Sequence, residues 1–89
     1  MNKAEFNQIV NEGINRGRMF MIVKIQTEGN PAPEIIINSS ENFSQKIKYY
    51  LSAYNDEMEL IKAKEAGKLI AITDVLMTSN LNDLSWFVY

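Results

Sequence analysis

A chain of 89 residues without cysteine can build only one hydrophobic core, and no disulfide can reinforce that core. At this size folding buries about 60 to 65% of the surface that the unfolded chain exposes, so the core is marginal. Hydrophobic residues make up 46% of the chain and charged residues 22%, which is an ordinary globular composition. We therefore expect one folded domain over residues 1–89, to which self-association would add stability.

Histidine is absent as well as cysteine, and together these absences remove most neutral-pH proton transfer, thiolate chemistry and transition-metal binding from the available functions. The remaining carboxylate, lysine and hydroxyl groups show no spacing that predicts an active site. We therefore expect no cofactor and no catalysis. Nine Lys and Arg against eleven Asp and Glu give a net charge of -2, which offers no general attraction to nucleic acid or anionic lipid.

The N-terminal residues lead into an amphipathic pattern and lack the basic and apolar regions of a signal peptide. The longest apolar run, Met19 to Val23, is far shorter than the roughly 20 residues that span a bilayer. These two features predict a soluble cytoplasmic protein.

The same N-terminal residues predict an amphipathic helix. Asn2 and Glu5 have the spacing of a capping box, in which each side chain bonds the backbone of the other residue. Apolar side chains then recur at helical intervals from Phe6 to Ile14, and Gly17 is the residue expected to end the helix.

Two strands joined as a hairpin are expected next. Thr27 to Pro33 contains one glycine and two prolines, which predict a loop, and Glu34 to Ile37 resumes as a strand. Before the loop, Met19 to Ile25 is rich in β-branched and aromatic residues, and its alternation places three side chains on one face: Phe20, Ile22 and Lys24.

A long helical pattern follows, with Ser39 or Ser40 as its cap. A continuous helix from Glu41 to Ala66 would be about 39 Å long, more than a domain of this size covers, so we predict a break at Asn55-Asp56. After the break, a third helix would begin with acidic residues, which favour the positive end of a helix dipole, and end at Gly67. The alternative is a short strand through Met58 and Leu60.

The C-terminal residues predict two more strands. Leu69 to Met77 forms one long strand, Ser79 to Asp83 has turn-forming residues, and Leu84 to Tyr89 forms the last strand. The resulting order α-β-β-α-α-β-β most simply gives an α+β fold. We expect a four-stranded, mainly antiparallel sheet with two or three helices packed on one face.

Aromatic residues concentrate at the C-terminus, and as a strand this segment would be hydrophobic on both faces. One face can pack on the core, whereas the other needs a helix or another molecule to cover it. If the strand lies at the sheet edge, it is also a template for a homodimer. Tyrosine is common in binding surfaces, and one lies at the margin of the buried stripe of the second helix. The predicted interface residues are Tyr49, Trp86, Phe87 and Tyr89.

Several polar groups offer other chemistry. The acids Asp56, Glu57 and Glu59 suit a hard cation but lack the spacing of a calcium loop, so we interpret them as acids of a helix start. Asp74 interrupts an apolar strand. It would be a candidate acid or base if buried, and otherwise marks a solvent-facing position or a bulge, with Lys24 as a possible charge partner. The helix start at Ser39 and Ser40 is a candidate anion site.

Nucleic-acid binding is the alternative function, because basic and aromatic residues occur together before and within the second helix. Tyr49 and Tyr50 are neighbours on that helix and point about 100° apart, so they cannot form one flat stacking platform. The candidate residues for this alternative are Arg16, Arg18, Lys46 and Lys48.

One segment carries a resemblance to known proteins. It comprises Ser40-Glu41-Asn42-Phe43, Lys46, Tyr49-Tyr50, Ala53-Tyr54-Asn55-Asp56 and Leu60. The segment resembles small uncharacterised proteins encoded by phages and mobile elements of low-GC Gram-positive bacteria. The resemblance implies a setting in which short proteins bind a host or phage protein or sequester a ligand. Our hypothesis is therefore a non-catalytic, phage-encoded interaction protein that binds a host or phage protein stoichiometrically and forms a homodimer.

Overall fold

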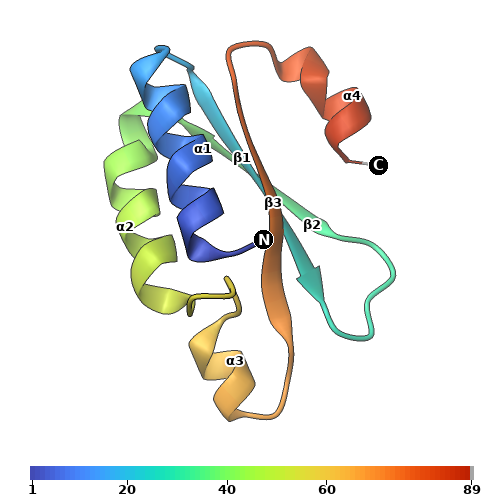
Figure 1. The fold of residues 1–89 in the computed structure, drawn as a ribbon. Coiled ribbons are helices and arrows are strands. Elements are labelled where there is room, and N and C mark those ends of the chain that lie inside the picture. Colours follow the sequence, from blue (N-terminus) through green and yellow to red (C-terminus); the bar gives the residue numbers. More distant parts are fainter. Residues whose placement is uncertain (89) are drawn as a thin grey trace.

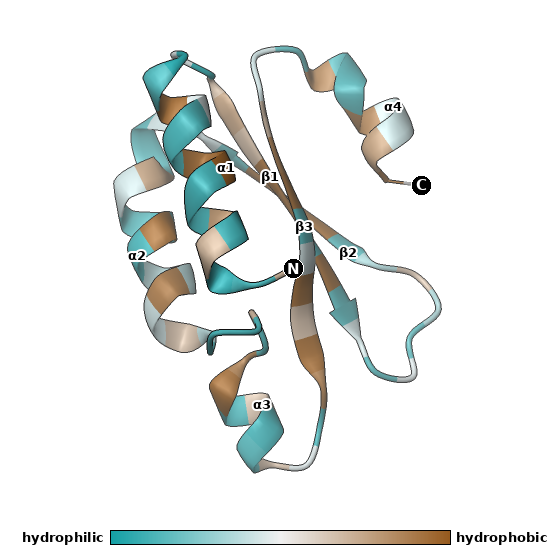
Figure 2. Cartoon of the chain, viewed as in Figure 1, coloured by the Kyte–Doolittle hydropathy of each residue, from teal (hydrophilic) through white to brown (hydrophobic). Residues whose placement is uncertain are grey.

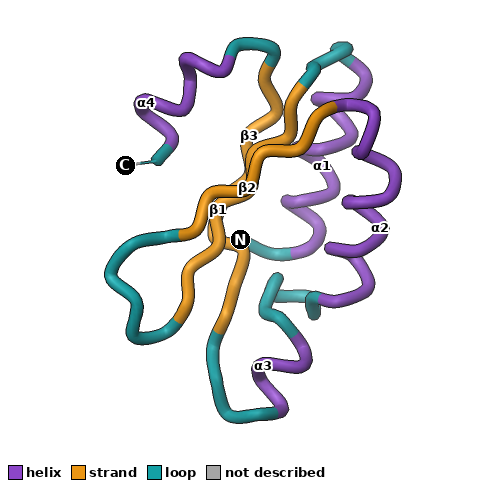
Figure 3. The backbone as a smooth tube through the Cα atoms, turned by 180° about the vertical axis from the view of Figure 1, so that it is seen from behind, coloured by secondary structure: helices purple, strands orange, loops and turns teal. Residues whose placement is uncertain are grey.

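The computed structural model describes residues 1–88 and contains one antiparallel sheet with helices on both faces. The strands lie in the order β2-β1-β3. α1 and α2 lie side by side on one face, and α4 lies on the other (Figures 1 and 3). The elements are α1 (Lys3–Asn15), β1 (Phe20–Thr27), β2 (Glu34–Ser39), η1 (Ser40–Asn42), α2 (Phe43–Ala53), α3 (Ile61–Glu65), β3 (Ile70–Thr78), η2 (Leu81–Asp83) and α4 (Leu84–Phe87).

The predicted four-stranded sheet is wrong, because the described chain forms three strands and the expected fourth strand is the helical turn α4. Side-chain hydrogen bonds stabilise this turn. The Asn80 amide oxygen accepts from the Asn82 N–H at 3.0 Å, and the Asp83 carboxylate accepts from the Thr78 hydroxyl at 2.6 Å and the Trp86 indole at 3.2 Å. The helices therefore do not all pack on one face of the sheet.

The predicted N-terminal helix is confirmed as α1, including its capping box. The Asn2 side chain accepts from the Glu5 N–H at 2.8 Å, and the Glu5 carboxylate accepts from the Asn2 N–H at 3.1 Å. Gly17 follows the helix at φ +70°, a left-handed conformation that glycine adopts without strain. Hydrophobic and hydrophilic residues alternate along both α1 and α2 (Figure 2), as expected for helices that bury one face.

The predicted hairpin is also confirmed, because β1 and β2 pair antiparallel. The sheet face toward α1 and α2 carries the main core, whose fully buried strand residues include Met21 and Val23. On the opposite face, the register aligns cross-strand rows. One row is Ile37, Ile22 and Leu76, and the next is Ile35, Lys24 and Asp74.

The predicted break at Asn55-Asp56 is confirmed, since α2 ends at Ala53. The third helix begins only at Ile61, so the acidic residues do not lie at its start. The alternative through Met58 and Leu60 describes this segment better, because it forms two isolated β-bridges, one of them with β3. Met58 is fully buried and adopts a left-handed φ of 58°, which is unusual for a residue with a side chain.

Candidate interaction surface

Tyr49 lies on the outer side of α2, where its side chain is 50% exposed. The next residue, Tyr50, belongs to the buried stripe, so the helix turns Tyr49 to the margin as predicted. The Tyr49 ring packs edge-to-face against Tyr50 and Tyr54, with centroid distances of 5.5 and 6.5 Å. The two buried rings hold the exposed ring in a defined orientation.

Two hollows adjoin Tyr49 and share Leu60 as a second common wall. The first lies between α2 and α3 and has a volume of about 480 Å³. The second lies between α2 and the sheet and has a volume of about 340 Å³. Their walls are mainly apolar, and each carries one lysine and one glutamate: Lys62 and Glu65 in the first, Lys46 and Glu34 in the second. We call Tyr49, Leu60, the half-exposed Ile61 and these hollows the Tyr49 surface.

The two buried tyrosines behind Tyr49 have raised pKa values. Burial, opposed in part by the nearby Asn38 amide, raises the pKa of Tyr50, whose hydroxyl has no partner in good hydrogen-bond geometry among residues 1–88. Burial also raises the pKa of Tyr54 to about 12, and the neighbouring Tyr49 adds to this effect. Both groups are therefore uncharged near neutral pH and act as apolar supports of the surface.

The Tyr54 pKa predicts a loss of stability at alkaline pH. In the unfolded chain this hydroxyl ionises near pH 10, below its folded-state pKa. The contribution of Tyr54 to stability is therefore complete below about pH 10 and is lost as the pH rises toward 12. We expect the Tyr54→Phe variant to lose less stability over this range than the wild type, as measured by urea unfolding at several pH values. Equal losses of stability in the two proteins would contradict a raised pKa of Tyr54 in the folded chain.

α4, which carries the predicted contact residues Trp86 and Phe87, lies on the other side of the sheet from α2 (Figure 1). Trp86 is 58% exposed, and its indole is held by Asp83. Phe87 is only 3% exposed, with the Lys24 ammonium 4.8 Å from its ring centroid. Its ring is thus part of the fold and not of the surface. Tyr89 lies outside the described residues.

The acidic candidates do not assemble into a site. Asp74 is exposed beside a β-bulge, and its carboxylate accepts from the Val75 N–H at 2.8 Å. It lies opposite Lys24 in the register, yet the two form no ion pair. Glu59 pairs with Lys64 at 2.8 Å, a contact that lowers the pKa of this glutamate. Within residues 1–88 no group of three acidic residues is arranged to hold a metal ion.

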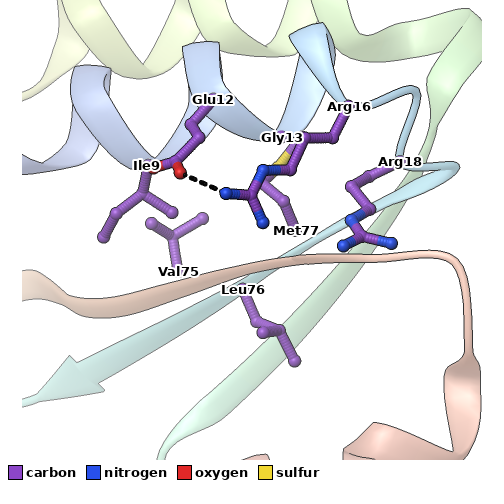
Figure 4. Close-up of a pocket in the computed structure, with 8 residues that line it drawn as sticks. All are labelled: Ile9, Glu12, Gly13, Arg16, Arg18, Val75, Leu76 and Met77. Carbon is purple, nitrogen blue, oxygen red and sulfur yellow. Dashed lines mark hydrogen bonds and ion pairs between the residues drawn. The ribbon is translucent and has the colours of Figure 1, made fainter.

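The basic candidates for nucleic-acid binding are dispersed. Arg16 is ion-paired with Glu12 at 2.9 Å, and both line a 230 Å³ hollow between α1 and β3 that also includes Arg18 (Figure 4). Lys46 faces the hollow beside the sheet, whereas Lys48 lines a groove between α1 and α2. The four side chains therefore do not form one continuous basic patch.

At the candidate anion site, the start of the second helical segment, one of the two serines is already bonded within the chain. The Ser39 hydroxyl donates to the Glu41 carboxylate at 3.0 Å, so a carboxylate of the chain already occupies it. No side chain caps the N-terminus of α2, which begins after the 3-10 turn η1. Ser40 lines a hollow of about 570 Å³ together with Arg18 and Ser44, so the anion site stays a prediction.

Sequence reasoning missed the contribution of α3 to the Tyr49 surface. Ile61 continues the hydrophobic spacing of the preceding helix, which favours a buried position, yet in the structure it lines the first hollow. The break at Asn55 was the available signal. The Asn55 side-chain oxygen accepts from the N–H groups of Glu57 and Glu59, and this turn redirects the chain so that α3 lies beside Tyr49.

No protein-family model matches this chain, and no curated protein or solved structure matches it either. The longest helix of the described residues has 13 residues, and none is both long and apolar enough to cross a membrane.

Proposed function

We propose that this chain is a small non-catalytic interaction protein that binds a protein partner stoichiometrically through the Tyr49 surface. The observation that carries the proposal is the half-exposed Tyr49 ring, held edge-to-face by two buried tyrosines between two hollows. The resemblance to phage and mobile-element proteins falls on α2 and the Asn55 turn, the segments that form this surface. A host or phage protein is accordingly the proposed class of partner.

The low conformational cost of covering Tyr49 supports this proposal. An exposed side chain that is already ordered loses little conformational freedom when a partner covers it. Tyrosine adds a large rigid contact area with one polar tip, which explains its enrichment among residues that dominate binding energy. Each hollow can receive a side chain of the partner, and the balanced lysine and glutamate pairs favour a partner surface without strong net charge.

The test begins with affinity capture of binding proteins by the immobilised wild type and by Tyr49→Ala. Each captured protein is then purified and titrated by calorimetry. We expect one partner per chain and a dissociation constant that Tyr49→Ala weakens by about 10-fold to 100-fold, as for a residue at the centre of an interface. The matched control is Trp86→Ala, which removes a similarly exposed aromatic on the far side of the sheet.

Two outcomes would contradict this proposal. Equal affinity of the wild type and Tyr49→Ala would remove the Tyr49 surface from the interaction. Binding to nucleic acid that weakens steeply with salt and depends on Lys46 and Lys48 would favour the alternative function.

A further inference from the structure

The two edges of the sheet differ in how they are protected against pairing with another strand. At the β3 edge, the Leu60 N–H donates to the Ile70 carbonyl at 2.7 Å, and the Ile72 N–H donates to the Met58 carbonyl at 2.9 Å. Past the bulge, the Asp74 carboxylate accepts from the Val75 N–H. The edge of β3 is thus covered by a chain segment, interrupted by a bulge and capped by a charged side chain, three devices that prevent strand addition.

The edge of β2 has none of these devices. Its pairing with β1 continues without a register shift from Glu34 to Ser39, and no proline occurs within it. Between Ile35 and Asn38 it carries no charge, and Ile37 is 46% exposed. Within residues 1–88, β1 is the one segment that pairs with β2.

The outward backbone groups of β2 follow from the alternation of an antiparallel sheet. The Lys24 carbonyl accepts from a β3 side chain, Thr73, whereas the Met21 carbonyl accepts from a β2 side chain, Asn38. The backbone N–H and C=O groups of Met21 and Val23 therefore point toward β2. Their partners in β2, Asn38 and Ile36, point their own N–H and C=O groups back toward β1. By the same alternation, the N–H and C=O groups of Ile35 and Ile37 point away from β1, toward the free edge of the sheet.

We propose that β2 pairs antiparallel with β2 of a second copy of this chain about a two-fold axis at Ile36. Two three-stranded sheets then form one six-stranded sheet. In this register Ile35 lies opposite Ile37 of the second copy, so two residues with outward backbone groups exchange hydrogen bonds. The inference rests on the sheet edge and does not require the function proposed for the Tyr49 surface, although Glu34 and Ile36 of β2 also line the second hollow of that surface.

The residues of β2 favour a second copy of this chain as the partner that pairs with its edge. Its three isoleucines are flanked by Glu34 and Asn38, so pairing about Ile36 places each glutamate opposite an asparagine and avoids a pair of like charges. The apolar row of Leu76, Ile22 and Ile37 continues into Ile35 of the second copy. The net charge of -2 is also small enough that two copies repel each other weakly.

The experiment measures the solution mass of the full-length chain by sedimentation at several concentrations. We expect a dimer for the wild type. Ile37→Pro removes an outward N–H, and Ile37→Lys places a charge beside the two-fold axis, so both should raise the dimer dissociation constant at least tenfold. The matched control is Ile14→Lys on α1, a position of similar exposure that is distant from the β2 edge and should leave the dimer intact.

Amide hydrogen exchange tests the register independently. The N–H groups of Ile35 and Ile37 should exchange slowly in the dimer and faster on dilution, whereas that of Ile36 should be protected in both states. A monomeric wild type, or a dimer that persists in both Ile37 variants, would overturn the proposal. Tyr49→Ala changes no residue of β2. The effect of this variant on partner affinity tests the proposed function, whereas the solution mass of the wild type tests the dimer, so each proposal can be contradicted without the other.

Discussion

Replacing Gly13 with alanine should lower the free energy of unfolding by about 1 to 3 kcal/mol, because α1 approaches β3 too closely to accept a methyl group. A Cβ atom at this position would lie 2.3 Å from Cβ and 2.5 Å from Cγ of Met77. The Met77 Cβ is fixed to the backbone of β3, so the contact cannot be relieved by rotation of the side chain alone. Either the helix or the strand must move.

The sign of this effect separates packing from helix propensity. Alanine is better than glycine in a helix interior by about 1 kcal/mol, so propensity alone predicts stabilisation. Urea unfolding of Gly13→Ala measures the difference, with Asn11→Ala as the control at an exposed position of the same helix. The double variant with Met77→Ala should recover part of the loss, which a double-mutant cycle reports as a coupling energy. Stabilisation by Gly13→Ala would contradict the close approach of α1 to β3.

Elements with strong local signals were predictable from the sequence. The capping box of Asn2 and Glu5, the hairpin loop and the break at Asn55 each depend on residues a few positions apart, and the structure contains all three. The last segment was not predictable in this way. Its aromatic residues favour a strand, but bonds from Asp83 to Thr78 and Trp86 and the apolar sheet face decide for a helical turn.

The candidate surfaces also differ in whether they depend on local sequence or on tertiary contacts. Tyr49 was identifiable because its position relative to the buried stripe of α2 is a local property. The hollows beside it were not, because they depend on α3, and α3 follows a left-handed Met58 that no local rule assigns to a methionine. The β2 edge was missed for a topological reason. With a fourth strand expected at the C-terminus, that strand was the predicted site of pairing.

Phe87→Ala should cost about 3 to 5 kcal/mol, whereas Trp86→Ala, one residue earlier, should cost about 1 kcal/mol or less. Phe87 is buried on the sheet face opposite the main core, where the fully buried Ile22 and the stem of Lys24 also lie. Its loss opens a cavity and removes the main apolar anchor of a helix that has only one turn. Trp86 projects into solvent and loses mainly its edge contact with Phe87 and its bond to Asp83.

The difference in stability loss between Phe87→Ala and Trp86→Ala tests directly whether the last segment is a helical turn or a strand. A strand would send the two side chains to opposite faces of the sheet, and packing between two covered faces would make both substitutions costly. A helical turn buries Phe87 and leaves Trp86 outside, so the costs must differ. Urea unfolding followed by circular dichroism serves both variants, since Trp86 is the chain's only tryptophan and its fluorescence is lost in one of them. Similar costs for the two, whether large or small, would contradict α4 as the cover of this face.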